Sequence, residues 1–407
     1  MPRSVETVAL LQHSSGTTGQ KKGVMLTHGQ IERQIASYAA SLGFTGDDIV
    51  ASWLPLYHDM GLFSSFLMPI MLGATILSLD PFEWVAAPHR LLQVVAEGRA
   101  SHCWMPNFAF SHIRRYVEAA QPPRQDLSTL RAIISCSEPV RADTLAQFRS
   151  YFADQGLSPA APQACYAMAE TVFAISQSDV SRPVRTLRID PVALTEPGQP
   201  VRRLSEGGAE HVSNGRPIAG IRVRIETAAG RVEVCPGARS EAAGEIQVSG
   251  DFVFDGYYRN PEGTAQAFTE DGWYRTGDIG FCDEGEIFVC GRTKELLIIH
   301  GKNYYVGDIE QVLSAIEGVK PGRAVVFDIF DPETDSDECV VMAETELEDP
   351  ASLRSLKREI RERVAQRLTL QVRSIELVAP GTLVKTTSGK MSRSENRKVW
   401  MLAREGR

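Results

Sequence analysis

The stretch DGWYRTGDIGFCDEGEIFVCGRTKELLIIHGK, residues 271–302, decides how the rest of this chain is interpreted. Its glycines separate three short apolar runs, at residues 279–281, 286–289 and 296–299. Short apolar runs bounded by glycine turns are typical of strands, so the stretch predicts tight strands joined by turns.

Two kinds of charged side chain stand at the glycine turns of this stretch. Asp278 lies between Gly277 and Gly280, and Arg292 and Lys294 follow a later glycine turn. A carboxylate and a guanidinium on neighbouring turns suit the hydroxyls of a sugar and the charge of a phosphate. The alternative is an ordinary surface hairpin with solvated charges.

The two halves of the stretch carry a resemblance. YRTGD at residues 274–278 and GRTKELLIIHGKN at residues 291–303 resemble the paired late motifs of the adenylate-forming superfamily. That superfamily includes acyl-CoA synthetases, peptide-synthetase adenylation domains, luciferases and fatty acyl-AMP ligases. The resemblance implies that Asp278 holds the ribose hydroxyls, that Arg292 supports the ribose, and that Lys294 is the hinge between two domains.

Length and composition set the class of protein. The 407 residues are 43% hydrophobic and 23% charged, which is ordinary for a globular protein with more than one domain. The net charge of −8 argues against a general nucleic-acid or anionic-membrane binder, because phosphate affinity needs clustered lysine and arginine. Seven cysteines without a CxxC pair or zinc spacing predict a reducing cytoplasm, and the N-terminus shows no signal-peptide pattern.

One uncharged run, at residues 60–79, approaches the length of a membrane span. It contains Pro69 and Gly73, which interrupt a helix. The run therefore predicts a buried helix that ends near residue 72, followed by a strand at residues 74–79, and no membrane span.

A polar loop, HSSGTTGQKKGV at residues 13–24, follows a predicted strand at residues 8–12. Its amides and hydroxyls can surround phosphate oxygens. The Walker spacing fails because Lys21 stands where glycine is required. The loop instead resembles the family pattern T-S-G-[ST]-T-G-x-P-K-G, with Lys21 in place of proline. The resemblance implies phosphate contacts from Ser14, Ser15, Gly16, Thr17, Thr18, Gly19 and Lys22, with Thr17 also near the metal.

Two further segments point to an acyl pocket. SWLPLYHDMG at residues 52–61 resembles the fourth family motif, in its fatty acyl-AMP ligase form, and implies that His58 lies near the substrate carboxylate as a catalytic residue. An isolated histidine is otherwise most often structural. PNFAF at residues 106–110 resembles a segment of the same branch and implies that Asn107, Phe108 and Phe110 line the pocket; core packing is the alternative.

The adenine side is predicted from two turns that follow strands. SCSEP at residues 135–139 resembles the family's G-[AS]-E-P turn, and CYAMAE at residues 165–170 resembles Y-G-x-[TA]-E, with alanine where glycine is usual. The resemblance implies that Tyr166 stacks on adenine and that Glu170 reaches the magnesium ion, in keeping with aromatic–base stacking and the oxygen preference of hard cations. The remaining implied nucleotide contacts are Ser137, Glu138, Pro139, Ala167 and Met168.

The chain as a whole is predicted to be an α/β protein. Helix and strand signals alternate between residues 91 and 152, as in a layered domain. Residues 181–213 are irregular, and in fatty acyl-AMP ligases an extra segment at this position is thought to hinder CoA transfer. One helix face carries apolar residues at intervals of three or four, which predicts core packing; they are Leu353, Leu356, Ile360, Val364 and Leu368. TTSGK at residues 386–390 resembles the last family motif, which implies that Lys390 is the catalytic lysine.

These motifs imply a large layered α/β N-terminal domain, residues 1–292, truncated at its start, and a small α+β lid, residues 293–407. The expected reaction uses ATP and Mg²⁺ to convert a carboxylic acid, expected to be a fatty acid, into an acyl adenylate and pyrophosphate. The acyl group then passes to the thiol of an acyl carrier protein. The expected location is cytoplasmic, with no nucleic-acid partner.

Several alternatives stay open. An acyl-CoA or aryl-CoA synthetase differs in its acceptor, and a non-catalytic scaffold differs in lacking the chemistry. Family members carry roughly 150 further residues before the phosphate loop, so a split enzyme whose partner chain supplies them is another expectation. A P-loop kinase is disfavoured by Lys21.

Overall fold

The computed structural model describes residues 4–14, 22–190, 194, 199–299, 302–331, 336–385 and 391–405. The side chains left out within these ranges are those of Ser14, Lys294, Asn303, Asp331, Ser336, Arg404 and Glu405. The chain forms two compact units. Unit 1 comprises Met1–Asp190 and Gly198–Cys290, and unit 2 comprises Pro191–Pro197 and Gly291–Arg407.

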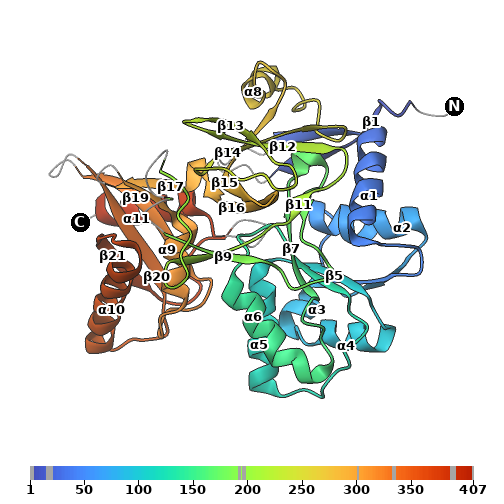
Figure 1. Ribbon diagram of the computed structural model, residues 1–407. Helices are drawn as coiled ribbons and strands as arrows, with labels where there is room; N and C mark the ends of the chain where they lie inside the picture. The colour runs from blue at the N-terminus through green and yellow to red at the C-terminus, as the bar shows by residue number, and fades with distance from the viewer. Residues whose placement is uncertain are drawn as a thin grey trace. The chain divides into compact units, whose positions relative to one another are not determined.

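A seven-stranded sheet forms the centre of unit 1 (Figure 1), and its strand order is β11-β8-β7-β6-β5-β3-β4. The strands from β4 to β7 are parallel, whereas β8 and β11 run antiparallel to their neighbours. The sheet strands are β3 (Ile49–Ser52), β4 (Thr75–Ser78), β5 (His102–Met105), β6 (Ala132–Ser135), β7 (Pro162–Ala167), β8 (Ala174–Gln177) and β11 (Arg216–Pro217).

Helices cover both faces of this sheet. Figure 1 shows α3, α4, α5 and α6 together on one face, with α1 and α2 on the other. The α-helices of this part are α1 (His28–Leu42), α2 (Met68–Leu72), α3 (Pro81–Ala86), α4 (Arg90–Gly98), α5 (Asn107–Ala120) and α6 (Ala142–Phe152). A short helix η2 (Ala153–Gln155) follows α6.

Alternate residues of the parallel strands pack against the helices on opposite faces of the sheet. Trp104 and Ile134 pack with α1, whereas Cys103 and Ile133, one residue earlier in each strand, pack with α4, α5 and α6. Successive strand side chains point to opposite faces, and a parallel sheet covered on both sides needs apolar residues at both. The sequence accordingly reads as short continuous apolar runs.

Helix α1 begins and ends at recognisable residues. Thr27 and Gln30 form a capping box, in which the Gln30 amide donates to Thr27 Oγ1 at 3.2 Å and the Thr27 amide donates to Gln30 Oε1 at 2.9 Å. Gly43 ends the helix with φ 59°, in the left-handed region that glycine adopts most easily. The capping box and the glycine therefore set the bounds of the helix at His28 and Leu42.

The second sheet of unit 1 is antiparallel, with strand order β13-β12-β14-β15-β16. Its strands are β12 (Ile221–Thr227), β13 (Gly230–Glu233), β14 (Gly244–Gly250), β15 (Tyr274–Asp283) and β16 (Glu286–Arg292). The other elements of the unit are β1 (Val8–Ser14), β2 (Lys22–Thr27), β9 (Thr186–Ile189), β10 (Ala209–Val212) and α8 (Pro261–Ala267). The predicted strands at residues 8–12, 279–281 and 286–289 all lie within these elements.

Two predictions about unit 1 need correction. Residues 60–72 do form a helix, but the first part, η1 (Met60–Leu67), is a π-helix, and Ile70, Met71 and Leu72 at its end are exposed rather than buried. Residues 181–213, predicted to be irregular, contain the antiparallel pair β9–β10. Arginines from this segment hold it to the β15–β16 hairpin: Arg185 and Arg203 pair with Asp283, and Arg182 pairs with Glu286 at 2.9 Å.

Unit 2 is a three-stranded sheet with helices on both faces. Val326 and Val341 pack with α9 and α10, whereas Phe327 and Val340, the adjacent residues, pack with Trp400 of α11. The elements are η4 (Thr293–Glu295), β17 (Leu296–Ile299), β18 (Lys302–Tyr305), α9 (Val306–Ser314), β19 (Ala324–Asp331), β20 (Ser336–Glu344), α10 (Pro350–Leu368), β21 (Val372–Val378) and α11 (Arg393–Glu405).

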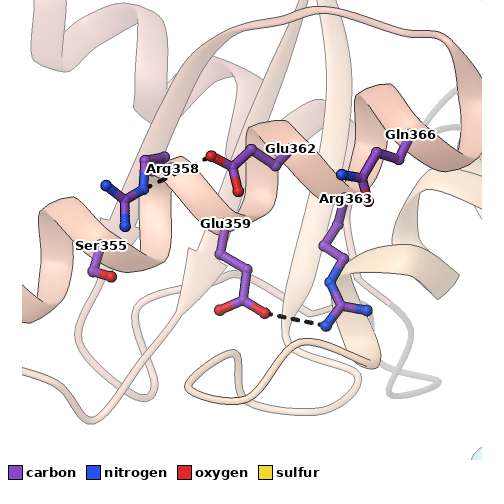
Figure 2. A pocket seen from close by; sticks show the side chains of 6 residues that line it. All are labelled: Ser355, Arg358, Glu359, Glu362, Arg363 and Gln366. Atoms are coloured by element: carbon purple, nitrogen blue, oxygen red, sulfur yellow. Dashed lines mark ion pairs between the residues drawn. The ribbon is translucent and has the colours of Figure 1, made fainter.

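The apolar stripe of α10 packs into the core, as predicted: Leu356, Ile360 and Val364 are buried, and Leu353 and Leu368 at its two ends are half-buried. On the solvent face of the same helix, Figure 2 shows a hollow lined by charged and polar side chains. Two ion pairs at i,i+4 spacing span it: Arg358 with Glu362 at 3.8 Å and Arg363 with Glu359 at 3.5 Å. No residue of the predicted site lines this hollow. Within the described ranges, no helix has both the length and the apolar character to span a bilayer.

Candidate functional site

Asp278 is presented by a bulge in β15. Gln247 of β14 pairs with Arg275 and Glu245 pairs with Ile279, so β15 has extra residues between these partners. Gly277 in the bulge has φ 70°, which is why glycine suits this position. Thr276 Oγ1 donates to the Ile246 carbonyl at 2.6 Å and accepts from the Asp278 amide at 3.0 Å. The bulge thus holds the aspartate that the sequence predicted to lie at a bend.

Tyr166 and Asp278 are joined directly. The Tyr166 hydroxyl, at the end of β7, donates to Asp278 Oδ2 at 2.6 Å, although 112 positions separate the two residues. Only 7% of Tyr166 and 3% of Asp278 are exposed. A carboxylate can accept several hydrogen bonds, including those from sugar hydroxyls. The residues predicted for adenine and for ribose therefore lie side by side.

Glu170 follows on the short helix η3 (Ala169–Thr171), directly after β7. Val172 ends this helix with φ 64° and ψ −57°, and the Phe173 amide donates to the Thr171 carbonyl at 2.7 Å, which closes a tight γ-turn. A β-branched residue at positive φ is strained. The surrounding contacts therefore hold the Glu170 turn in an uncommon conformation.

Two buried tyrosines lie at Glu170. The Tyr257 hydroxyl donates to Glu170 Oε1 at 3.0 Å, and the Tyr274 hydroxyl lies 3.5 Å from that of Tyr257. Burial, and then the Glu170 charge, raise the pKa of both tyrosines above the ordinary value. Both hydroxyls therefore stay protonated at neutral pH and remain hydrogen-bond donors.

Lys22, the first residue of β2, lies on the other side of Tyr257. Its Nζ is 4.5 Å from the centroid of the Tyr257 ring. A cation over an aromatic face is attracted by the ring quadrupole. One tyrosine, Tyr257, thus contacts both the phosphate-loop lysine Lys22 and the predicted metal ligand Glu170. Sequence analysis did not assign this tyrosine to the site. The Gly-Tyr-Tyr motif at residues 256–258 was the available signal.

Magnesium is commonly held in nucleotide sites by one or two carboxylates together with substrate phosphates. Glu170 is buried and oriented by Tyr257, so it fits a cation that arrives with a nucleotide. The other predicted metal position, Thr17, lies outside the described residues.

The predicted adenine turn meets the predicted pocket segment. Glu138 Oε2 accepts from the Phe108 amide at 3.1 Å, and Asn107 Oδ1 accepts from the Arg141 amide at 3.1 Å. Ser137 adopts φ 68° in this turn. The turn after β6 and the start of α5 are therefore locked together. Of the remaining predicted residues here, Ala167 is half-buried, Met168 is buried and Pro139 is exposed.

The two phenylalanines of PNFAF point in different directions. Phe108 is 47% exposed and its ring is 6.1 Å from that of Trp84, which itself stacks on Trp53 at 3.6 Å. Phe110 is 0% exposed and packs against Phe148 of α6. Residues two apart on a helix do not share a face. Phe110 therefore packs in the core beside α6, and its assignment to the pocket stays a prediction.

His58 lies just before the π-helix η1. Its Nδ1 is 2.6 Å from Asp59 Oδ1, and Asp59 caps the helix by accepting from the Met60 amide at 2.8 Å. Gln12 of β1 donates to the Tyr57 carbonyl at 3.3 Å and links this turn to the strand before the phosphate loop. The His58 ring is half-buried, so it combines a fixed orientation with access from solvent.

Several predicted residues cannot be located in the same way. Arg292 ends β16 and belongs to unit 2, whereas Asp278 belongs to unit 1. Ser15, Gly16, Thr17, Thr18, Gly19 and Lys390 lie outside the described residues, as do the side chains of Ser14 and Lys294. Their assignments stay predictions.

The family match and the relatives with similar sequences point to the same protein family. Residues 2–258 match the family described as AMP-binding enzyme. Long-chain-fatty-acid–AMP ligase FadD26 of Mycobacterium tuberculosis is 34% identical over 409 residues, which cover 95% of this chain and 68% of the relative.

Solved structures are similar as well. A structure of fatty acyl-adenylate ligases from E. coli and L. pneumophila has a TM-score of 0.86 at 25% identity, covering 98% of this chain and 70% of that chain. McyG A-PCP complexed with phenylalanyl-adenylate has a TM-score of 0.82 at 27% identity, covering 99% of this chain and 59% of that chain. The chain thus spans 59% to 70% of the length of these three proteins.

Proposed function

The chain belongs to the AMP-binding enzyme family and to its acid–AMP ligase branch, and from this premise we propose that it joins a fatty acid to AMP. The observation that carries the proposal is the 2.6 Å hydrogen bond from Tyr166 to Asp278, with Glu170 held four residues after Tyr166. This arrangement supports a nucleotide bound with its adenine and ribose at the first pair and its phosphates near Glu170.

The proposed reaction transfers the adenylyl group to the acid. A carboxylate oxygen attacks the α-phosphorus of ATP, the bond from that phosphorus to the bridging oxygen breaks, and pyrophosphate leaves with the bond's electron pair. Tyr166, Asp278 and Arg292 hold the nucleoside, and Lys22 with the preceding loop binds the outer phosphates. Mg²⁺ that arrives with ATP supplies positive charge to the leaving pyrophosphate, and Glu170 would hold it.

Lys390 has the central role in this proposal. An ammonium group between the acid and the α-phosphate draws two anions together and stabilises the charge that develops in the transition state. After adenylation, rotation about Lys294 withdraws Lys390 and admits a thiol. Phe108, which is 47% exposed and packs against the buried Trp84, supplies apolar surface beside the adenine turn, and this supports a fatty rather than an amino acid.

The proposed acceptor is the phosphopantetheine thiol of an acyl carrier protein, in a reducing cytoplasm. The segment that contains β9 and β10 supports this choice over CoA, because Arg182, Arg185 and Arg203 hold it against Asp283 and Glu286. A segment fixed in this way can restrict the closure that CoA transfer requires.

We expect thioester to form on a holo carrier protein and not on CoA. The protein is incubated with ATP, Mg²⁺ and a fatty acid, and then with either acceptor, and both products are measured by mass spectrometry. A carrier protein without phosphopantetheine is the control and stays unmodified. Acyl-CoA formation faster than carrier acylation would assign the chain to the acyl-CoA synthetases instead.

A further inference from the structure

We propose that Tyr257 is a positioning residue that orients the Glu170 carboxylate for Mg·ATP and holds Lys22 on the same ring. The inference rests on the proposed function, because it gives Glu170 and Lys22 the metal and the phosphates as partners. Tyr257 belongs to the Gly-Tyr-Tyr motif at residues 256–258 and lies on neither β2, which carries Lys22, nor η3, which carries Glu170.

The contacts of Tyr257 come from two directions. Its hydroxyl donates to Glu170 Oε1 at 3.0 Å, whereas the face of its ring lies 4.5 Å from Lys22 Nζ. The two charged residues are 148 positions apart in sequence, and the tyrosine contacts both. A movement of this one ring would therefore change the position of both charges.

The backbone around Tyr257 fixes the ring. Tyr257 bridges to Val24 of β2, the Tyr258 amide donates to the Gly23 carbonyl at 2.8 Å, and the Met25 amide donates to the Gly256 carbonyl at 3.2 Å. The Tyr257 amide itself donates to Thr264 Oγ1 at 2.9 Å. The segment thus extends the β1–β2 pair by a third, short partner, which keeps Tyr257 in register with Lys22.

The same segment also holds the backbone of Glu170. The Phe254 amide donates to the Glu170 carbonyl at 2.8 Å, and the Phe254 ring packs edge-on against Tyr257 at 4.8 Å. Both the main chain and the side chain of Glu170 are therefore set by residues 254–257. Val172, strained at φ 64°, completes the turn from the other end.

The chemistry requires a neutral donor at this position. The Tyr257 hydroxyl donates to Glu170 Oε1 at 3.0 Å, and only 6% of Tyr257 is exposed, so the donor is buried beside the carboxylate. A donor to one carboxylate oxygen fixes the plane of the carboxylate before a cation binds. Groups that orient a metal ligand in this way commonly change metal affinity or activity by about 10–100-fold when removed.

The test separates the two contacts. Tyr257→Phe removes the hydroxyl and keeps the ring under Lys22, whereas Tyr257→Leu removes both. We expect Tyr257→Phe to raise the Mg²⁺ concentration for half-maximal ATP–pyrophosphate exchange by about 10-fold, with the KM for fatty acid unchanged. Tyr257→Leu should in addition raise the KM for ATP. Tyr258→Phe, the same change at the exposed neighbouring tyrosine, should alter neither value.

A binding measurement complements the kinetics. The rise in Tm that Mg²⁺ produces in the presence of ATP, without acid, should be smaller in Tyr257→Phe than in the wild type. If the wild type shows exchange and Tyr257→Phe keeps the wild-type Mg²⁺ dependence and Tm rise, the positioning role is wrong while the proposed function stands. If the folded wild type shows no exchange with any acid and no stabilisation by Mg·ATP, both fail together.

Discussion

Replacing Lys390 with alanine is expected to reduce acyl-adenylate formation by at least about 10²–10³-fold, because removing one group that stabilises transition-state charge typically costs that much. The ammonium is the charge assigned to the carboxylate and the α-phosphate as they meet, and alanine leaves their repulsion unopposed. The measurement is acid-dependent release of pyrophosphate, with circular dichroism to show that the variant is folded.

The control for this variant is Lys398→Ala, which removes an exposed lysine of α11 that pairs with Glu395 at 2.8 Å. It should retain normal activity. A second measurement separates adenylation from acyl transfer. Lys390→Ala supplied with ready-made acyl adenylate should still transfer the acyl group to the carrier thiol. Near-normal adenylation by Lys390→Ala would remove Lys390 from the mechanism.

Replacing Glu170 with glutamine is expected to lower exchange by about 10²-fold or more at ordinary Mg²⁺ concentrations. Glutamine has the same shape, and its side-chain oxygen can still accept from the Tyr257 hydroxyl, so the packing is kept. It lacks the negative charge that a hard cation prefers in its ligands. The loss should therefore be partly restored by high Mg²⁺, which a titration of the exchange rate measures.

Glu241→Gln provides the matched control, because Glu241 is exposed and lies outside the site. Its Mg²⁺ titration should coincide with that of the wild type. An unchanged Mg²⁺ requirement in Glu170→Gln would show that the cation does not use this carboxylate and would leave Glu170 as a purely structural partner of Tyr257.

Local signals in the sequence predict much of the fold. Strands β5 and β6, which begin at His102 and Ala132, are short and mainly apolar runs, and β15 to β17 are apolar runs between glycine turns, so the sequence indicates their positions directly. The motifs around Tyr166 and Asp278 also predicted two residues that prove to be neighbours. Each of these features depends on residues close together in the chain.

Features set by distant residues could not be predicted. The β9–β10 pair lies in a segment rich in glycine, proline and arginine. Its arginines pair with Asp283 and Glu286 of the β15–β16 hairpin, about 80 to 100 positions later in the chain, so local sequence does not indicate these contacts. Tyr257 is separated from Glu170 by 87 positions, so the sequence around neither residue predicts the hydrogen bond between them.

Helix geometry explains the remaining differences. Phe108 and Phe110 look alike in the sequence, but α5 begins at Asn107 and turns them to different sides, so that one is half-exposed and the other buried. In η1, apolar residues at residues 60–67 are compatible with any helix. Two side chains form hydrogen bonds with the backbone of this π-helix: Asp59 caps its first residue, and Ser64 Oγ donates to the Met60 carbonyl at 2.5 Å.

The most direct test of the central claim is acid-dependent ATP–pyrophosphate exchange by this 407-residue chain alone, with fatty, aryl and amino acids supplied in parallel. We predict exchange that requires a fatty acid, is far weaker with the other acids, and disappears in Lys390→Ala. Folded protein that shows no exchange with any of these acids would contradict the account, because the described site would then lack the adenylating activity proposed for it.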